Sequence, residues 1–166
     1  MSVNVTPLTA DELAYVDELA KCFGLDGYPF ETARVVGYLL ISDPPAQSVE
    51  EIAEAIGRTK EQVAEDAALI KQFGLAEPSP TDETKLRIRP SQWSDILSGR
   101  REGLAQMSDL LAKGMELLPP DPARLERLEF MAELYGFFAA RIPALMNEWQ
   151  EHITAWQAAR DARVAA

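Results

Sequence analysis

The sequence is poor in cysteine and histidine, which narrows the chemistry open to the protein. Its 166 residues include one cysteine, Cys22, and one histidine, His152. A lone cysteine excludes an internal disulfide and fits a reduced, cytoplasmic setting. His152 has no cysteine or carboxylate at a convincing metal-ligand spacing, and we favour a structural role or a single ion pair with Glu148. We therefore expect no metal and no cofactor.

The sequence also lacks a long apolar run and a signal-peptide pattern, so we expect no membrane partner. No glycine-rich phosphate loop and no serine–histidine–aspartate arrangement is present, and we expect that the protein is not an enzyme. Hydrophobic residues make up 47% of the chain and charged residues 26%. These proportions are ordinary for a soluble globular protein of this length.

Positive charge is scarce, because 16 lysines and arginines face 27 acidic residues and give a net charge of −11. Nucleic-acid binders commonly present a basic face, since neutralising phosphates supplies much of their affinity. An acidic chain can still carry a local basic patch, so the distribution of charge decides more than its sum.

The first half of the chain is predicted to form four helices. Thr9 with Glu12 caps a helix that ends near Leu25, and a second, densely apolar helix runs from Pro29 or Phe30 through "ETARVVGYLLI". The third helix is capped by Ser48 with Glu51 and ends near Gly57. The fourth is capped by Thr59 with Gln62 and runs to about Phe73. The last two, joined by a tight turn, have the layout of a helix-turn-helix.

A wing follows the four helices, and the second half, which Pro90 starts, is predicted to form long helices. "PSPTDET" is turn chemistry and "LRIR" alternates as a strand does, so a β-hairpin is expected there. One long helix should run from Pro90 to about Leu118, where "PPDP" ends it. Another should span about Ala123 to Ile142, with Pro143 kinking it or beginning a new helix. "QAARDARVAA" is expected to be a flexible tail.

Large apolar side chains recur at helical spacing along the last helices. Such a stripe exceeds what one small domain can cover, and a large exposed apolar surface usually marks a partner site. A homodimer is the economical interpretation, because two-fold dimers are the commonest oligomers. The alternative is that the stripe packs wholly within the chain. The predicted dimer contacts are Leu134, Phe138, Leu145, Trp149 and Ile153.

Two long stretches of the sequence resemble the MarR-like winged-helix transcriptional regulators, and specifically their GbsR/MarR branch. The first is "RVVGYLLISDPPAQSVEEIAEAIGRTKEQV", with "GLAE" after it, and the resemblance is strongest from Arg34 to Trp93. The second, "RLERLEFMAELYGFFAARIPALMNEWQ", looks like that branch's C-terminal dimer helices. The resemblance covers most of the chain beyond the first thirty residues.

The resemblance implies a mainly α-helical fold: a winged helix-turn-helix with a small β-hairpin wing and long N- and C-terminal dimerisation helices. It implies a dimeric regulator that binds a palindromic operator in double-stranded DNA and is often controlled by a small-molecule effector. The domains would be a dimerisation helix over 1–30, the winged helix over 31–90, dimerisation helices over 91–156 and the tail over 157–166.

The fourth helix and the wing supply the candidate DNA contacts. Thr59 and Lys60 match the start of the family's recognition helix, and Gln62 can take the place of the asparagine that the family often has there. Glu61, however, stands where the family has glycine. The outer face of this helix carries equal numbers of positive and negative charges. We predict DNA contacts at Arg58, Thr59, Lys60, Gln62, Lys85 and Arg87. Each cation could equally be an ordinary solvated charge.

Three alternatives stay open at the sequence level. The winged helix could instead be an acidic protein-interaction module that binds or heterodimerises with another regulator. Cys22 could sense peroxides as in some MarR-like proteins, although we favour a small buried apolar residue. Aromatic residues could line an effector site, although a place in the core is the commoner role of aromatics at helical spacing; the candidates are Tyr38, Trp93, Tyr135 and Trp149.

Overall fold

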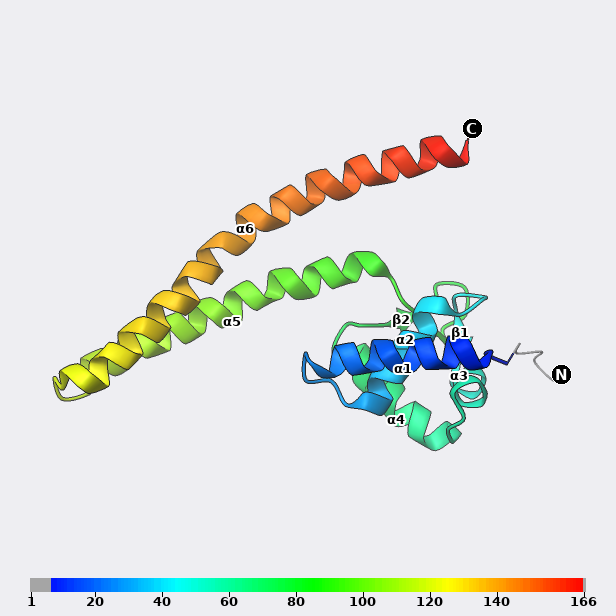
Figure 1. The fold of residues 1–166 in the computed structure, drawn as a ribbon, viewed down its shortest axis with the longest axis horizontal. Helices are drawn as coiled ribbons and strands as arrows, with labels where there is room; N and C mark the ends of the chain where they lie inside the picture. The colour runs from blue at the N-terminus through cyan, green and yellow to red at the C-terminus, as the bar shows by residue number, and fades with distance from the viewer. Residues whose placement is uncertain (1–6, 166) are drawn as a thin grey trace. The chain divides into compact units, whose positions relative to one another are not determined.

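A computed structural model describes residues 7–165, apart from the side chains of residues 92, 123 and 124. The chain divides into two compact units, the first ending at Trp93 and the second beginning at Ser94. The first unit holds four helices and a small sheet, and the second is a pair of long helices (Figure 1). The fold is thus a mainly α winged helix, as the sequence predicted.

Helices α1 (Ala10–Gly24) and α2 (Phe30–Ile41) pack together at the start of the first unit. Thr9 accepts a hydrogen bond from the backbone N–H of Glu12, and the Glu12 side chain accepts one from the backbone of Thr9, so the predicted capping box is confirmed. Gly37 permits the close approach of the two helices. A Cβ at this position would lie 3.2 Å from the carbonyl oxygen of Val16.

Helices α3 (Val49–Ile56) and α4 (Lys60–Gln72) form the helix-turn-helix. Ser48 with Glu51 caps α3, and Thr59 with Gln62 caps α4, as predicted. Gly57 ends α3 with φ +69°, a left-handed conformation that glycine adopts without the steric cost of a Cβ. The turn between α3 and α4 could therefore be predicted from the capping pattern and this glycine.

The wing contains three strands rather than the predicted two. Strands β1 (Gln47–Ser48), β2 (Glu77–Pro78) and β3 (Lys85–Arg87) form an antiparallel sheet in the order β1-β3-β2. The hairpin of β2 and β3 was predicted, but β1 was missed because two residues show no alternation. β1 pairs through Gln47 opposite Leu86.

The core of the first unit lies between its helices and the sheet. Apolar side chains from α1, α2, α3, α4 and β3 are all buried there. Its largest fully buried side chains are Val16, Val35, Val36, Ile52, Val63 and Ile70. Burial of this kind supplies about 25 cal/mol per Å² of apolar surface removed from water.

The second unit is a helical hairpin of α5 (Pro90–Leu117), which begins just before the unit boundary, and α6 (Pro122–Val164). Figure 1 shows the first half of α6 running beside α5. Ser108 Oγ on α5 donates a hydrogen bond to the carbonyl oxygen of Ala132 on α6, at 3.0 Å. A Cβ added to Gly136 would lie only 3.1 Å from the same Oγ, so a small residue is needed where the helices touch.

One boundary in this unit differs from the sequence prediction, and one open alternative is decided. Pro143 lies inside α6, and the helix continues on both sides of it, so the proline does not begin a new helix. The segment 157–166, expected to be a flexible tail, is helical as far as Val164. The segment is rich in alanine and arginine, which favour helix, and Arg160 stacks over Trp156 one turn earlier. Residues 1–6 of the predicted N-terminal segment, and residue 166, lie outside the described residues.

Candidate nucleic-acid interface and apolar face

The outer face of α4 is open to solvent. Val63, Ala67 and Ile70 point into the core, at the spacing of one helical face. The exposed side chains on the rest of the helix include two lysines and two glutamates. They are Lys60, Glu61, Gln62, Ala64, Glu65, Ala68, Lys71 and Gln72. The helix therefore presents a mixed surface rather than a basic one.

Arg58, a predicted phosphate contact, is instead tied into the first unit. Its guanidinium pairs with Asp66 on α4, and its Nε lies 3.5 Å from Oε2 of Glu31 on α2. Asp66 also accepts a hydrogen bond from Thr32 Oγ1, at 2.7 Å. The Arg58 side chain is only 16% exposed and that of Asp66 only 12%. This cluster holds the start of α4 against α2 and gives Asp66, which lies on the flank of α4, a structural role.

Lys60 is the most accessible of the four predicted cations. It pairs with Glu50 on α3, and both side chains are about 60% exposed, at 61% and 59%. The hydrogen bond to Glu50 raises the pKa of Lys60, so the ammonium stays charged at neutral pH. An exposed pair of this kind contributes little stability, and a phosphate can displace Glu50 at small cost.

Lys85, on the middle strand of the wing, is paired with a buried carboxylate. Its Nζ donates to both oxygens of Glu51, at 2.8 and 3.0 Å, and the Glu51 side chain is 5% exposed. Burial raises the pKa of Glu51, but hydrogen bonds from Lys85 and from the backbone N–H of Ser48 outweigh it, so that pKa lies below its ordinary value. Lys85 therefore fastens the wing to α3.

Arg87 is paired across the wing with Glu77, its Nη2 lying 2.7 Å from Oε1. Arg89 reaches the other oxygen of Glu77 at 3.4 Å and is half exposed. The wing tip carries no basic side chain, because residues 79–84 are "SPTDET". Asp82 instead accepts hydrogen bonds from the backbone and hydroxyl of Thr84, which close the turn.

The remaining two predicted contacts, Thr59 and Gln62, form the capping box of α4. Thr59 Oγ1 accepts from the backbone N–H of Gln62, and Gln62 Oε1 accepts from the backbone N–H of Thr59, both at 3.3 Å. The capping role predicted for these two residues is confirmed, but the sequence prediction missed the carboxylates that pair with the four cations. Glu51, the partner of Lys85, lies 34 residues away, and no local pattern reveals that pairing.

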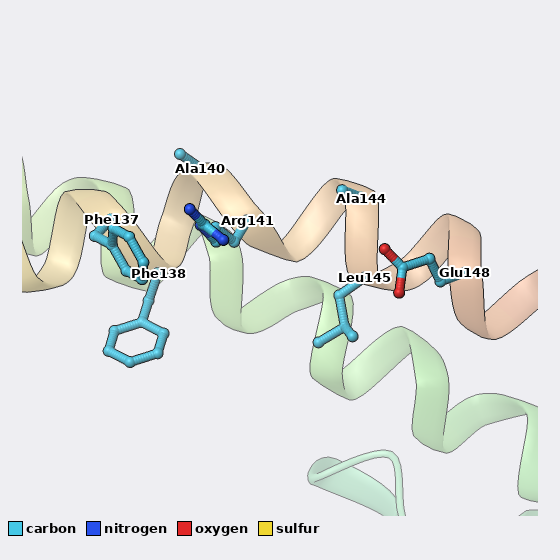
Figure 2. Close-up of a pocket in the computed structure, with 7 residues that line it drawn as sticks. All are labelled: Phe137, Phe138, Ala140, Arg141, Ala144, Leu145 and Glu148. Carbon is cyan, nitrogen blue, oxygen red and sulfur yellow. The ribbon is translucent and has the colours of Figure 1, made fainter.

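The second unit carries a different kind of surface, which is apolar. Among the described side chains of α6, Ala139 alone is buried. Four of the five predicted dimer contacts are exposed, namely Leu134, Phe138, Leu145 and Trp149, and Ile153 is half-buried. A groove of about 450 Å³ lies along α6, and Figure 2 shows its lining: Phe137, Phe138, Ala140, Arg141, Ala144, Leu145 and Glu148.

The cysteine and two of the aromatic residues proposed for sensing or effector binding have structural positions. The expectation that Cys22 is buried is wrong, since α1 turns Val16 and Ala20 inward and leaves Cys22 exposed. Tyr38 is buried and donates to Gln47 Oε1 at 3.0 Å, and Trp93 donates to the Leu75 carbonyl at 3.3 Å. Within residues 7–165 no group of three or more potential ligands could hold a metal ion.

Two comparisons with known proteins find a similarity to the same kind of regulator. A family described as MmpR5-like MarR family transcriptional regulators matches residues 91–152. The HTH-type transcriptional regulator MmpR5 of Mycobacterium tuberculosis is 28% identical over 131 residues, which cover 76% of this chain and 79% of the relative. The chain is thus similar to MarR-like regulators over these stretches.

A solved structure has a similar fold. The crystal structure of a transcriptional regulator superposes with a TM-score of 0.69 at 25% identity, covering 85% of this chain and 99% of that one. The family match lies in the C-terminal helices, whereas the motif that predicts a DNA reader lies in the first unit. The family match and the helix-turn-helix thus lie in different parts of the chain. No stretch of the described helices combines the length and apolarity needed to cross a bilayer.

Proposed function

We propose that the chain regulates transcription by binding double-stranded DNA as a homodimer. The observation that carries this proposal is the exposed outer face of α4 in a capped helix-turn-helix, flanked by a three-stranded wing. The two relatives described above are both called transcriptional regulators, which supports the same function. A regulator of transcription works at the chromosome, so the cytoplasm is the compartment we propose.

In this proposal α4 of each subunit lies in the major groove, and the two helices meet successive grooves about 34 Å apart. Gln62 can pair with adenine, and Glu61 or Glu65 can accept a hydrogen bond from the amino group of cytosine. These acidic side chains bring repulsion from phosphates, which a dimer experiences twice. Contacts with the bases must therefore supply most of the affinity, because the attraction between the protein and the phosphates is weak.

The ion pairs of the first unit separate the predicted phosphate contacts into two groups. Lys60 is exposed and loosely paired, so it is the strongest candidate for a phosphate contact. Arg58 and Lys85 are held by carboxylates of low exposure, so they position α4 and the wing rather than contact DNA. Arg87 is intermediate, with its side chain 35% exposed. Few cations remain, and the affinity should fall only gently as salt rises.

The homodimer is supported by the exposed apolar side chains of α5 and α6. A hairpin with so few buried residues leaves more apolar surface in water than monomeric proteins usually do. A second copy covering this surface would stabilise both chains. A small-molecule effector would act by changing the distance between the two α4 helices, because it need only bind one arrangement better than the other.

The first experiment is selection from a pool of random duplex DNA with the purified full-length protein, at low salt and then at rising salt. Recovery of a palindromic consensus, with affinity that falls as salt rises, is the expected result. Absence of any enrichment at low salt, from a protein shown to be folded and dimeric, would contradict DNA reading by this chain alone.

A second candidate function is an acidic interaction module that binds another, more basic regulator. The observation that favours it is the pairing of all four predicted phosphate-contacting cations with carboxylates of the same chain. The same selection experiment separates the two. A folded dimer that enriches no DNA alone, but alters the DNA binding of a basic MarR-like partner, would support the interaction module.

A further inference from the structure

The groove on α6 is lined by two opposite charges, Arg141 and Glu148, which lie about two helical turns apart. Arg141 lies three residues before Ala144, and Glu148 lies three residues after Leu145. The positive and negative side chains are therefore at equal distances along the helix from the point between Ala144 and Leu145. Both charges line the groove, together with the apolar side chains between them (Figure 2).

This placement matches what a two-fold contact requires. When two copies of a helix cross antiparallel about a two-fold axis, a residue before the axis meets the residue equally far beyond it. With the axis between Ala144 and Leu145, Arg141 of each copy would meet Glu148 of the other. A parallel arrangement would instead oppose like charges.

We propose that α6 of a second copy of this chain docks antiparallel in the groove, with reciprocal ion pairs between Arg141 and Glu148. This inference rests on the homodimer of the proposed function and specifies its contact, register and direction. The occupant is thus another copy of the same helix rather than a small ligand or an unrelated protein.

Small side chains in the groove fit a close contact between two helices. Ala140 and Ala144 line it, and side chains of this size let the backbones of two copies approach closely.

The charges are available for a second copy. Among the described residues neither Arg141 nor Glu148 takes part in an ion pair within its own chain. The Arg141 guanidinium carbon lies 4.4 Å from the centre of the Phe137 ring, which holds the side chain along the groove. A guanidinium positioned in this way loses less conformational freedom when it meets a carboxylate.

The opposite face of α6 is already used by α5. Ala132 accepts the hydrogen bond from Ser108, and Gly136 packs against the same side chain. At 100° per residue, Ala132 lies about half a turn around the helix from Arg141. The groove therefore faces away from α5, and a second copy can reach it without disturbing the hairpin.

The test is a charge reversal in the full-length protein, read out as the dimer dissociation constant by sedimentation equilibrium. The variants are Arg141→Glu, Glu148→Arg and the combination of both. Asp161→Arg, on another face of α6, reverses a charge in the same direction as Glu148→Arg and serves as the control. Circular dichroism confirms that each exposed substitution leaves the helices folded.

Each dimer would contain two of these ion pairs, so each single reversal should raise the dissociation constant about tenfold. The double variant should return to within about threefold of the wild type, because the pairs re-form with their signs exchanged. Mixing the two single variants should likewise restore association through a heterodimer. Asp161→Arg should leave the dissociation constant unchanged.

Two results would overturn the contact and are distinguishable from each other. A wild-type dimer unaffected by both single reversals would refute the antiparallel register and leave the homodimer in place. A wild-type chain that stays monomeric up to roughly 100 μM would refute both the contact and the homodimer. DNA selection is measured separately, so neither result is confused with a failure to bind DNA.

Discussion

The two units of this chain use their apolar residues in opposite ways. The first unit buries side chains from four helices and a strand in one core, and carboxylate–cation pairs fasten its surface. The second unit leaves most of its large apolar side chains exposed along α5 and α6. The first unit buries a core that holds α4 in place, whereas the second leaves an apolar surface in water. From this difference we propose that the first unit positions α4 and the second assembles the dimer.

The largest expected effect is the loss of a core side chain in the first unit. Leu75→Ala should lower the free energy of unfolding by about 2–5 kcal/mol, because Leu75 is 4% exposed and its removal leaves a cavity. Leu117→Ala in α5 is the matched control. Leu117 is 73% exposed, and its loss should cost less than about 0.5 kcal/mol. Urea unfolding measures both, and equal losses would erase the contrast between the units.

The next effect concerns the ion pair that positions α4. Arg58→Ala should lower the free energy of unfolding by about 2–3 kcal/mol, since it leaves the largely buried carboxylate of Asp66 without its cation. Arg101→Ala, at an exposed position on α5, is the control and should change stability little. If Arg58→Ala left stability intact but weakened DNA binding, Arg58 would be a phosphate contact after all.

A smaller effect should appear in the pH dependence of stability. The pKa of Glu51 is lowered in the folded protein, so its contribution is present above its ordinary value of 4.5 and is lost as pH falls through the folded pKa. Glu51→Gln keeps a side chain that can cap α3 but removes the charge that pairs with Lys85. It should cost about 1–2 kcal/mol at neutral pH.

The difference between the wild type and Glu51→Gln should shrink as pH falls below about 4.5, the ordinary value for this carboxyl. Urea unfolding at a series of pH values follows it. Glu54→Gln, at an exposed position of the same helix, is the control. A constant difference from pH 7 to pH 3 would show that the charge of Glu51 is not what fastens the wing.

The smallest effect on stability is expected at Lys60, which is the most exposed of the four predicted phosphate contacts. Lys60→Ala should leave the thermal midpoint unchanged, because its pair with Glu50 is open to solvent. It should weaken DNA binding and reduce the salt dependence by about one phosphate contact per subunit. Lys113→Ala on α5 is the control. A loss of stability without any change in salt dependence would move Lys60 into the structural group.

Much of the fold could be predicted from the sequence because its signals are local. Three capping boxes, the left-handed Gly57 and the "PPDP" break each lie within a few residues of the boundary they set. The two-residue strand β1 could not be found this way, since only its pairing with β3 defines it. The proline alone also did not decide whether α6 continues past Pro143 or a new helix begins there.

The candidate site was less predictable, because its electrostatics depend on distant partners. Arg58 and Lys85 looked like free surface cations, and only the fold brings Asp66 and Glu51 against them. The apolar stripe along α6 was predicted from helical spacing, and Leu145 was named as a dimer contact for that reason. Arg141 and Glu148 are seven residues apart in the sequence, but only the structure shows that both line the same groove.

The most direct test of the account is the composition of the protein–DNA complex on a duplex recovered by selection. Sedimentation velocity at low salt should show two chains for each palindromic site, and the complex should dissociate gently as salt rises. That result would join the assembly role of the second unit to the reading role of the first. A single chain bound per site, or a folded dimer that leaves the duplex free at low salt, would contradict the account.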